Sequence, residues 1–244
     1  MIKEIIKKIP YILPILRKKF PIIYSRYIGK YFSNQTYPIY ADVAVGKYYG
    51  KHDFISKQFY VFKNNPVYEE KLLLGINNFL DKNESVTIVG GGFGVTATKI
   101  SDITNRPLNI YEPSIEQIEI IEKTFKLNGV DTAKITIHNC AVSNNRYSYD
   151  GNKNTPAIQP SHIIPCDFLE LDCEGAELEI LRNLAFRPKK ILVETHGFRG
   201  SPTSEVIKCL NEMGYSILEL GIAEPRLWSD CVKNDIYVLY ASLK

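Results

Sequence analysis

A glycine-rich turn that joins an apolar segment to a helix-like segment constrains the fold of this chain most. Residues 86–96 read Val-Thr-Ile-Val-Gly-Gly-Gly-Phe-Gly-Val-Thr, and a second apolar segment ends in Tyr111-Glu112-Pro113. In α/β folds this order of strand, glycine turn, helix and acid-terminated strand binds a nucleoside. Glycines let the backbone approach the ligand, and the carboxylate accepts hydrogen bonds from ribose hydroxyls. The sequence therefore predicts a Rossmann-like domain whose nucleoside site includes Glu112.

The spacing of the glycines indicates which nucleoside is bound. A dinucleotide fingerprint requires Gly-x-Gly-x-x-Gly, but Val95 occupies the third glycine position after Gly90 and Gly92. The chain has Gly90-x-Gly92-x-Gly94 instead, a tighter turn that suits the amino-acid end of S-adenosylmethionine better than a pyrophosphate. We therefore predict S-adenosylmethionine as the cofactor, with Gly90, Gly91, Gly92 and Gly94 at its site. An NAD dehydrogenase ranks last among the alternatives.

Strand and helix patterns alternate along most of the chain. Strand-like segments lie at 86–90, 108–112, 134–138, 167–172, 189–195, 215–220 and 235–241, and helix-like segments at about 68–80, 94–103, 114–128, 175–186 and 202–213. Such alternation predicts a mostly parallel sheet with helices on both faces. The last two strands have no helical pattern between them, so we expect them to pair antiparallel through 221–234. Seven strands ending in this way resemble the sheet of a class I methyltransferase.

The chain of 244 residues is long enough for one sizeable core. We expect a domain over 68–244, preceded by an extension over 1–67 that is also a candidate lid. A polar stretch over 143–165 interrupts the alternation, and a loop of that length in a compact domain is usually functional or disordered. Whether this loop and the Tyr- and Phe-rich residues 36–65 close over the ligand is left open.

Positive charge is concentrated at the N-terminus. The net charge of +3 is too small to imply nucleic acid, but residues 1–30 carry eight lysines and arginines against the single acid Glu4. Isoleucines at 2, 5, 6 and 9 share one helical face, which predicts a short basic amphipathic helix. It could pack on the domain, lie on an anionic membrane surface, or contact nucleic acid or a protein partner.

The cysteines and the apolar segments bear on the compartment. The five cysteines form no Cys-x-x-Cys pair, and no segment approaches the ~20 apolar residues of a membrane-spanning helix. The first residues also lack the pattern of a secretory leader. We expect a cytoplasmic protein with reduced thiols, with peripheral contact at the inner membrane surface as the open alternative.

Acidic residues follow the strand predicted at 167–172. In a doubly wound sheet, ligands bind beyond the carboxyl ends of the strands. We therefore expect Asp172 and Glu174 at the rim of the cofactor pocket, against the alternative that they only cap the next helix. We expect Glu177 and Glu179 on a solvated helix face.

A second pair of polar residues ends the strand predicted at 189–195. Alternation along a strand puts Glu194 and His196 on the same face, at the same edge of the sheet. The histidine could accept a proton from a substrate hydroxyl, or it could be a structural imidazole. Together with Asp172 and Glu174 these residues have the donor types for a metal, but their spacing does not require one, and we predict none.

Three stretches resemble the FkbM-type family of S-adenosylmethionine-dependent methyltransferases. They are Ile110-Tyr-Glu-Pro-Ser114, Asn139-Cys-Ala-Val-Ser143 and Leu171-Asp-Cys-Glu-Gly-Ala-Glu-Leu-Glu-Ile-Leu181. The resemblance covers about 68–220 and implies a Rossmann-like class I fold and methyl transfer, usually to a hydroxyl oxygen of a sugar or natural product. By position it implies that the glycines approach the methionine part, Glu112 the ribose, Cys140 and Ala141 the adenine, and Asp172 the methyl donor.

The chain departs from the family pattern at two positions in the strands. Ile88 stands where the family commonly has an acid, and Glu170 stands where it often has a lysine. The family's usual Leu-Asp-Asp stretch is also missing, which leaves the loop 143–165. These departures leave the substrate class open.

The combined expectation is an O-methyltransferase that acts on a sugar, a glycan or glycolipid, or a small natural product. We expect His196 or Asp172 to accept the proton, with Glu174 or Glu194 orienting the base or a sugar hydroxyl. The alternatives are an RNA methyltransferase, which the scarcity of interleaved aromatic and basic residues disfavours, and a catalytically silent nucleoside-binding scaffold. Nucleic acid is not an expected partner, and the oligomeric state is left open.

Overall fold

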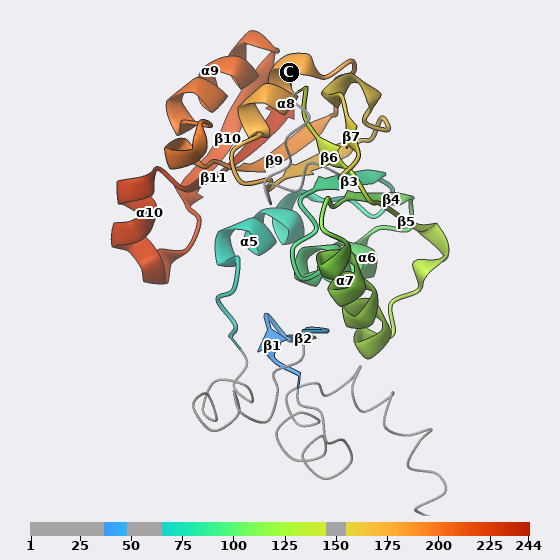
Figure 1. Ribbon diagram of the computed structural model, residues 1–244. Coiled ribbons are helices and arrows are strands. Elements are labelled where there is room, and N and C mark those ends of the chain that lie inside the picture. The colour runs from blue at the N-terminus through green and yellow to red at the C-terminus, as the bar shows by residue number, and fades with distance from the viewer. Residues whose placement is uncertain (1–36, 48–64, 145–154) are drawn as a thin grey trace, which may run out of the picture.

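The computed structural model describes residues 37–47, 65–144 and 155–244, and its centre is a seven-stranded sheet (Figure 1). The strand order is β10-β11-β9-β8-β3-β4-β5. The strands are β3 (Val86–Val89), β4 (Leu108–Tyr111), β5 (Ile135–His138), β8 (Phe168–Leu171), β9 (Lys190–Glu194), β10 (Tyr215–Ile222) and β11 (Tyr237–Leu243). Strands β5, β4, β3, β8 and β9 are parallel, and β11 pairs antiparallel with both β9 and β10. The predicted class I methyltransferase sheet is confirmed.

Helices cover both faces of this sheet. They are α5 (Glu70–Phe79), α6 (Val95–Ile103), α7 (Ile115–Asn128), α8 (Glu177–Asn183), α9 (Thr203–Glu212) and α10 (Trp228–Asn234). Figure 1 shows α8 and α9 above the sheet and α5, α6 and α7 below it.

Two buried clusters fill the space between the layers. Alternation within the strands divides the side chains between them, so that Ile88 packs toward α5, α6 and α7 while Val89 packs toward α8 and α9. Strands covered on both faces are buried on both, and in β8 all four residues are buried, including the charged Glu170.

The segment between β10 and β11 differs from the expectation. A 3-10 turn (Pro225–Leu227) and α10 lie within 221–234, so the prediction that no helix separates the last two strands is wrong. Helix α10 buries Cys231 and leaves Trp228 and Val232 exposed. The helix has only seven residues, which is shorter than the window of about 11–18 residues over which helical periodicity is recognised, so the pattern did not predict it. The antiparallel pairing itself is confirmed.

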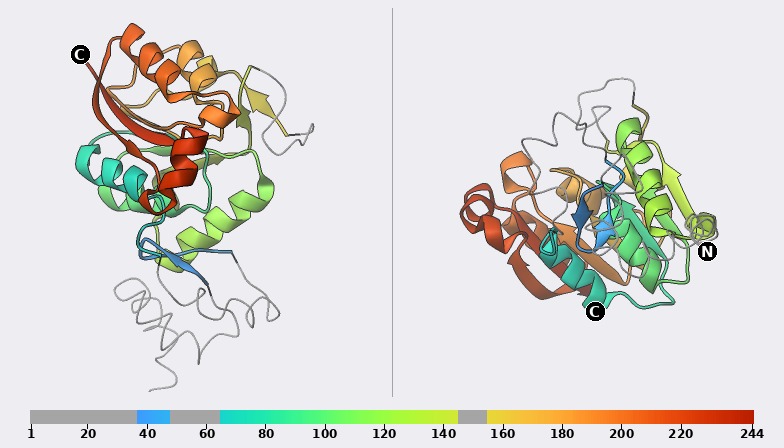
Figure 2. Two further views of the ribbon diagram at one scale, coloured as in Figure 1. Left: turned by 90° about the vertical axis from the view of Figure 1, so that its left-hand side faces the viewer. Right: turned by 90° about the horizontal axis from the view of Figure 1, so that it is seen from below.

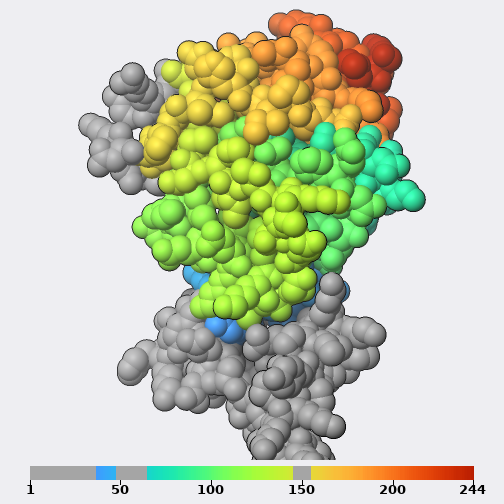
Figure 3. All heavy atoms as spheres, turned by 90° about the vertical axis from the view of Figure 1, so that its right-hand side faces the viewer, coloured from blue at the N-terminus to red at the C-terminus, as the bar shows by residue number. Residues whose placement is uncertain are grey.

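A small N-terminal hairpin packs beneath the domain. Strands β1 (Ile39–Tyr40) and β2 (Val43–Ala44) lie against α7, as Figure 2 shows, and in Figure 3 their blue atoms border the green part of the domain. The Asn128 side chain accepts a hydrogen bond from the Ala44 amide at 3.0 Å and donates to the Ala44 carbonyl at 2.8 Å. This part of the predicted extension is therefore fixed to the domain by polar contacts.

Other parts of the extension and the polar loop lie outside the described residues. These include the basic helix predicted near the N-terminus and most of the candidate lid. The described end of the loop forms β7 (Ala157–Ile158), which pairs in parallel with β6 (Ala141–Val142). Within the described ranges, no helix combines the length and apolar character needed to cross a membrane.

Replacing Asn128 by Ala is expected to lower the free energy of unfolding by about 1–3 kcal/mol, because both backbone groups of Ala44 lose their partner. Urea unfolding measures the loss, and hydrogen exchange should show faster exchange of the Ala44 amide. Asn77→Ala, on the exposed side of α5, is the matched control and should change neither quantity. Equal effects of the two substitutions would contradict this account of the hairpin.

Candidate functional site

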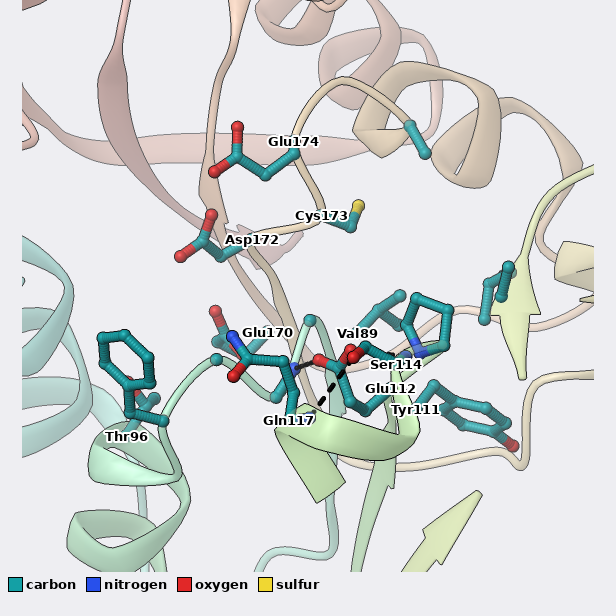
Figure 4. A pocket seen from close by; sticks show the side chains of 18 of the residues that line it. Val89, Thr96, Tyr111, Glu112, Ser114, Gln117, Glu170, Asp172, Cys173 and Glu174 are labelled. Carbon is teal, nitrogen blue, oxygen red and sulfur yellow. Dashed lines mark hydrogen bonds between the residues drawn. The ribbon is translucent and has the colours of Figure 1, made fainter. Parts of the chain in front are cut away.

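A cavity of about 870 Å³ opens at the carboxyl ends of β3, β4 and β8 (Figure 4). Its wall is built from the turn after β3, the end of β4, residues 140–143 and residues 170–176. This is the edge of a doubly wound sheet at which ligands bind. Eight of the predicted site residues line it, namely Gly90, Gly91, Gly92, Glu112, Cys140, Ala141, Asp172 and Glu174.

The glycine turn packs directly on the end of β8. Gly90 has a φ of +102°, and a Cβ at this position would collide with the backbone carbonyl of Asp172. Only glycine combines that backbone conformation with that approach. Gly94 lies outside the cavity wall, where its φ of +78° precedes the first turn of α6. The predicted glycines are therefore divided between the cavity and the start of the helix.

Glu112 connects the glycine turn to the end of β4. Its side chain is buried, and one carboxylate oxygen accepts the amide hydrogen of Gly91 at 3.0 Å while the other accepts that of Ser114 at 2.9 Å. A carboxylate oxygen has two lone pairs, so each can accept a further hydrogen bond from a ligand hydroxyl. The carboxylate therefore both positions the turn and faces the cavity (Figure 4).

Asp172, Glu174, Glu194 and His196 come together at the ends of β8 and β9. The parallel register pairs Leu171 with Val193, so the next residues, Asp172 and Glu194, are neighbours. The His196 Nε2 atom lies 3.7 Å from Asp172 Oδ1, 3.7 Å from Glu194 Oε1 and 3.8 Å from Glu174 Oε2. Asp172 and Glu174 line the cavity, whereas Glu194 and His196 lie behind them. The juxtaposition that strand alternation predicted is present.

Glu177 is the residue that fixes the histidine. Its Oε1 atom lies 2.9 Å from His196 Nδ1, and its carboxylate also accepts the backbone amides of Cys173 and Gly175. The side chain is fully buried, so the expectation of a solvated face is wrong for Glu177. It is also wrong for Glu179, which is half-buried and accepts a hydrogen bond from Ser143. The first turn of α8 packs against the loop after β9, and sequence periodicity cannot reveal that contact.

Burial and like charge shift the pKa values of this cluster. Burial, followed by the charge of Glu194, raises the pKa of Asp172 well above its ordinary value, and burial likewise raises that of Glu194. Burial alone would lower the pKa of His196, but the hydrogen bond to Glu177 and the nearby carboxylates outweigh it, so the pKa is raised. Such shifts are characteristic of functional sites.

Two further glutamates, the buried Glu170 and the half-buried Glu69, belong to the site although sequence reasoning did not select them for it. Glu170 lines the cavity, and neither of its carboxylate oxygens has a hydrogen-bond partner among the described residues. Glu69 lines it too, has a φ of +47°, and accepts a hydrogen bond from the Thr96 hydroxyl at 2.6 Å. The sequence offered a sign for Glu170, because it stands where the family often has a lysine. It offered no comparable sign for Glu69.

Aromatic side chains form the wall near the N-terminal hairpin. Tyr68 and Phe93 line the cavity, and Tyr40 stacks on Tyr68 with ring centroids 4.7 Å apart. The described end of the predicted extension therefore reaches a residue of the cavity wall.

Replacing Glu177 by Ala is expected to lower the free energy of unfolding by about 3 kcal/mol or more, because it removes one partner of a buried pair and two amide contacts. Glu179→Ala, in the same helical turn, should cost under about 1 kcal/mol. Urea unfolding of both variants makes the comparison. A loss for Glu177→Ala no larger than that for Glu179→Ala would show that the buried pair is not structural.

Comparison with solved structures agrees with the fold. The ribosomal protein L11 methylase from Lactobacillus delbrueckii subsp. bulgaricus has a TM-score of 0.52 at 15% identity, covering 75% of this chain and 80% of that chain. The protein SMU.776, crystallised with SAH, has a TM-score of 0.52 at 11% identity over 72% of this chain and 49% of that chain. No curated protein sequence matches.

These structural likenesses show the fold, and a family model shows the family. The model for the methyltransferase FkbM domain matches residues 56–217, well over half of the chain, and this range contains the glycine turn, Glu112 and the acidic cluster. The chain therefore belongs to the FkbM family of S-adenosylmethionine-dependent methyltransferases.

Proposed function

We propose that the chain transfers the methyl group of S-adenosylmethionine to a hydroxyl of a sugar, a glycan or glycolipid, or a small natural product. The observation that carries this proposal is the acidic wall of the cavity. Asp172 lines it and is itself the residue that the backbone of Gly90 contacts, while Glu194 and His196 lie behind Asp172. A hydroxyl acceptor loses a proton on methylation, and this wall is the part of the cavity that could promote that loss.

The reaction is an in-line displacement at the methyl carbon. A lone pair of the hydroxyl oxygen forms the new C–O bond as the C–S bond breaks, and its electron pair returns to sulfur to give the neutral thioether. The hydroxyl proton leaves to a base. Alignment of oxygen and methyl supplies much of the acceleration, and Asp172 or His196 assists the proton's departure, with Glu174 or Glu194 orienting the base or a second hydroxyl.

The cofactor would occupy the cavity from the glycine turn to the β6 segment. Gly90, Gly91 and Gly92 would face its methionine part, Glu112 its ribose, and Cys140 and Ala141 its adenine. Supporting this, all six residues line one cavity, and the Glu112 carboxylate is already held by two backbone amides. The sulfonium of the cofactor is cationic, which suits a wall rich in carboxylates.

No described feature favours RNA as the acceptor. A scaffold that binds the cofactor without turnover has one observation in its favour, the buried Glu170 beside Ile88 on neighbouring strands.

Contact of residues 1–30 with an anionic membrane surface, which would suit a lipid-linked glycan, stays a prediction because those residues lie outside the described ranges.

Glu112→Ala is expected to weaken binding of S-adenosylmethionine about 10- to 100-fold, since charge-assisted hydrogen bonds to ribose hydroxyls contribute about 1.5–3 kcal/mol. Isothermal titration calorimetry measures the affinity of both proteins for S-adenosylmethionine. NAD is titrated in a separate experiment, and we expect no binding of NAD. Glu119→Ala, at an exposed position of the following helix α7, should bind like the wild type. Wild-type affinity in Glu112→Ala would remove the ribose assignment, and a wild-type chain that binds no S-adenosylmethionine would remove the proposal.

Asp172→Asn and His196→Ala are each expected to lower turnover about 10²- to 10⁴-fold with a hydroxyl acceptor, as loss of assistance to proton transfer does. A screen of sugars, glycans and small natural products identifies the acceptor. Turnover is measured as the release of S-adenosylhomocysteine. Glu205→Gln, on the exposed side of α9, is the control. Wild-type turnover with unchanged cofactor affinity in His196→Ala would eliminate its assignment, and cofactor binding without turnover on any acceptor would favour the silent scaffold.

A further inference from the structure

The cluster behind the cavity wall has the donor set of a cation site. Among the described residues, Asp172, Glu194 and His196 each offer one ligand atom, and these atoms lie within 4.8 Å of one another. Two atoms bound to one cation at ~2.1 Å lie at most ~4.2 Å apart. The distances of 3.7 Å from His196 Nε2 to Asp172 and to Glu194 fall inside that limit. They exceed the range of a direct hydrogen bond.

The orientation of the histidine is the first sign of ligation. The buried Glu177 accepts from His196 Nδ1 at 2.9 Å, so the imidazole's other nitrogen is directed at the carboxylates. A histidine that binds a metal almost always donates its second ring N–H to a carboxylate or carbonyl, which fixes the tautomer and the ring. Glu177 stands in that outer position and is itself held by the amides of Cys173 and Gly175.

Glu170 is the second and independent sign. It is 1% exposed, and both of its oxygens lack a hydrogen-bond partner in the described part of the chain. Figure 4 shows its carboxylate on the same side of β8 as that of Asp172, because residues two apart on a strand share a face. A buried carboxylate without a partner costs free energy that a nearby positive charge would offset.

The local charge balance points in the same direction. Four carboxylates lie within 4 Å of one imidazole, those of Asp172, Glu174, Glu177 and Glu194, and the nearby Arg199 is paired with Glu174 at 3.2 Å. One imidazolium cannot balance this many carboxylates.

We propose that Asp172, Glu194 and His196 Nε2 bind one divalent transition-metal cation, with Glu177 orienting the histidine and Glu170 facing the site. One imidazole nitrogen with carboxylate oxygens suits cations of the Mn²⁺, Fe²⁺ and Zn²⁺ class better than Ca²⁺. This proposal departs from the sequence-based expectation that the chain holds no metal, which stays untested. Spacing along the chain could not reveal a site that depends on the register of β8 and β9.

The cation gives the acidic wall a defined part in the reaction. This role of the cation rests on the proposed function. The cation would bind the acceptor hydroxyl, or two vicinal hydroxyls, and favour loss of the hydroxyl proton, as a Lewis acid does. Asp172 and His196 would then act as ligands that hold the cation, and the hydroxyl proton would leave to solvent or to the carboxylate of Glu174, which also lines the cavity. Asp172 connects the site to the cavity because it belongs to both. An acceptor with vicinal hydroxyls, as in many sugars, fits this arrangement.

The test uses the full-length chain, stripped with a chelator and titrated with Mn²⁺ under electron paramagnetic resonance. We expect one Mn²⁺ per chain and, in the spin-echo spectrum, modulation from one directly bound imidazole nitrogen. Glu194→Gln should weaken Mn²⁺ at least tenfold while retaining the binding of S-adenosylhomocysteine, because Glu194 lies outside the cavity wall. Glu205→Gln is the matched control and should bind Mn²⁺ like the wild type.

The outcomes separate this inference from the proposed function. Absence of Mn²⁺ binding at millimolar concentration, absence of nitrogen modulation, or unchanged affinity in Glu194→Gln would each overturn the cation site, even if the cofactor binds and turns over. Mn²⁺ bound as expected by a chain that binds no S-adenosylmethionine would overturn the proposed function and leave the cation site. If Glu194→Gln shows no cooperative thermal transition, the variant does not fold and its Mn²⁺ affinity is not used. The nitrogen modulation in the wild-type chain then decides whether His196 binds the cation.

Discussion

The organisation of the acidic edge depends on the buried contact between Glu177 and His196. This contact joins the first turn of α8 to the loop after β9, two segments that meet only because β8 and β9 are parallel neighbours. The same carboxylate holds the amides of Cys173 and Gly175, which fixes the backbone that carries Asp172 and Glu174. One side chain therefore sets the direction of the imidazole and the position of the acids that line the cavity.

The glycine turn is the second constraint, and it meets the first at the end of β8. The backbone of Gly90 passes so close to the carbonyl of Asp172 that no side chain fits between them. Glu112 holds the adjacent Gly91 from the other side. The cavity thus has one wall suited to a nucleoside and another rich in carboxylates, and the two walls meet where Gly90 contacts Asp172.

The two departures from the family pattern are neighbours in the sheet. The register of β3 and β8 pairs Ile88 with Glu170, so an acid and a lysine at these positions would face each other across the strands. The chain has replaced both, which leaves a lone carboxylate instead of a pair. Because a buried charge of this kind is costly without a counter-charge, the two replacements are best understood together with the acids of the neighbouring strand end.

The sequence by itself determined the order of strands and helices, the glycine turn, the acid that ends β4, and the shared face of Glu194 and His196. Each depends on periodicity or on a local backbone requirement, and both can be recognised along the chain. Tertiary structure decided that Glu177 is buried, that Glu170 has no partner, that α10 exists, and which acids reach the cavity. These depend on which elements pack against one another, because periodicity assigns a residue to a face but does not determine what covers that face.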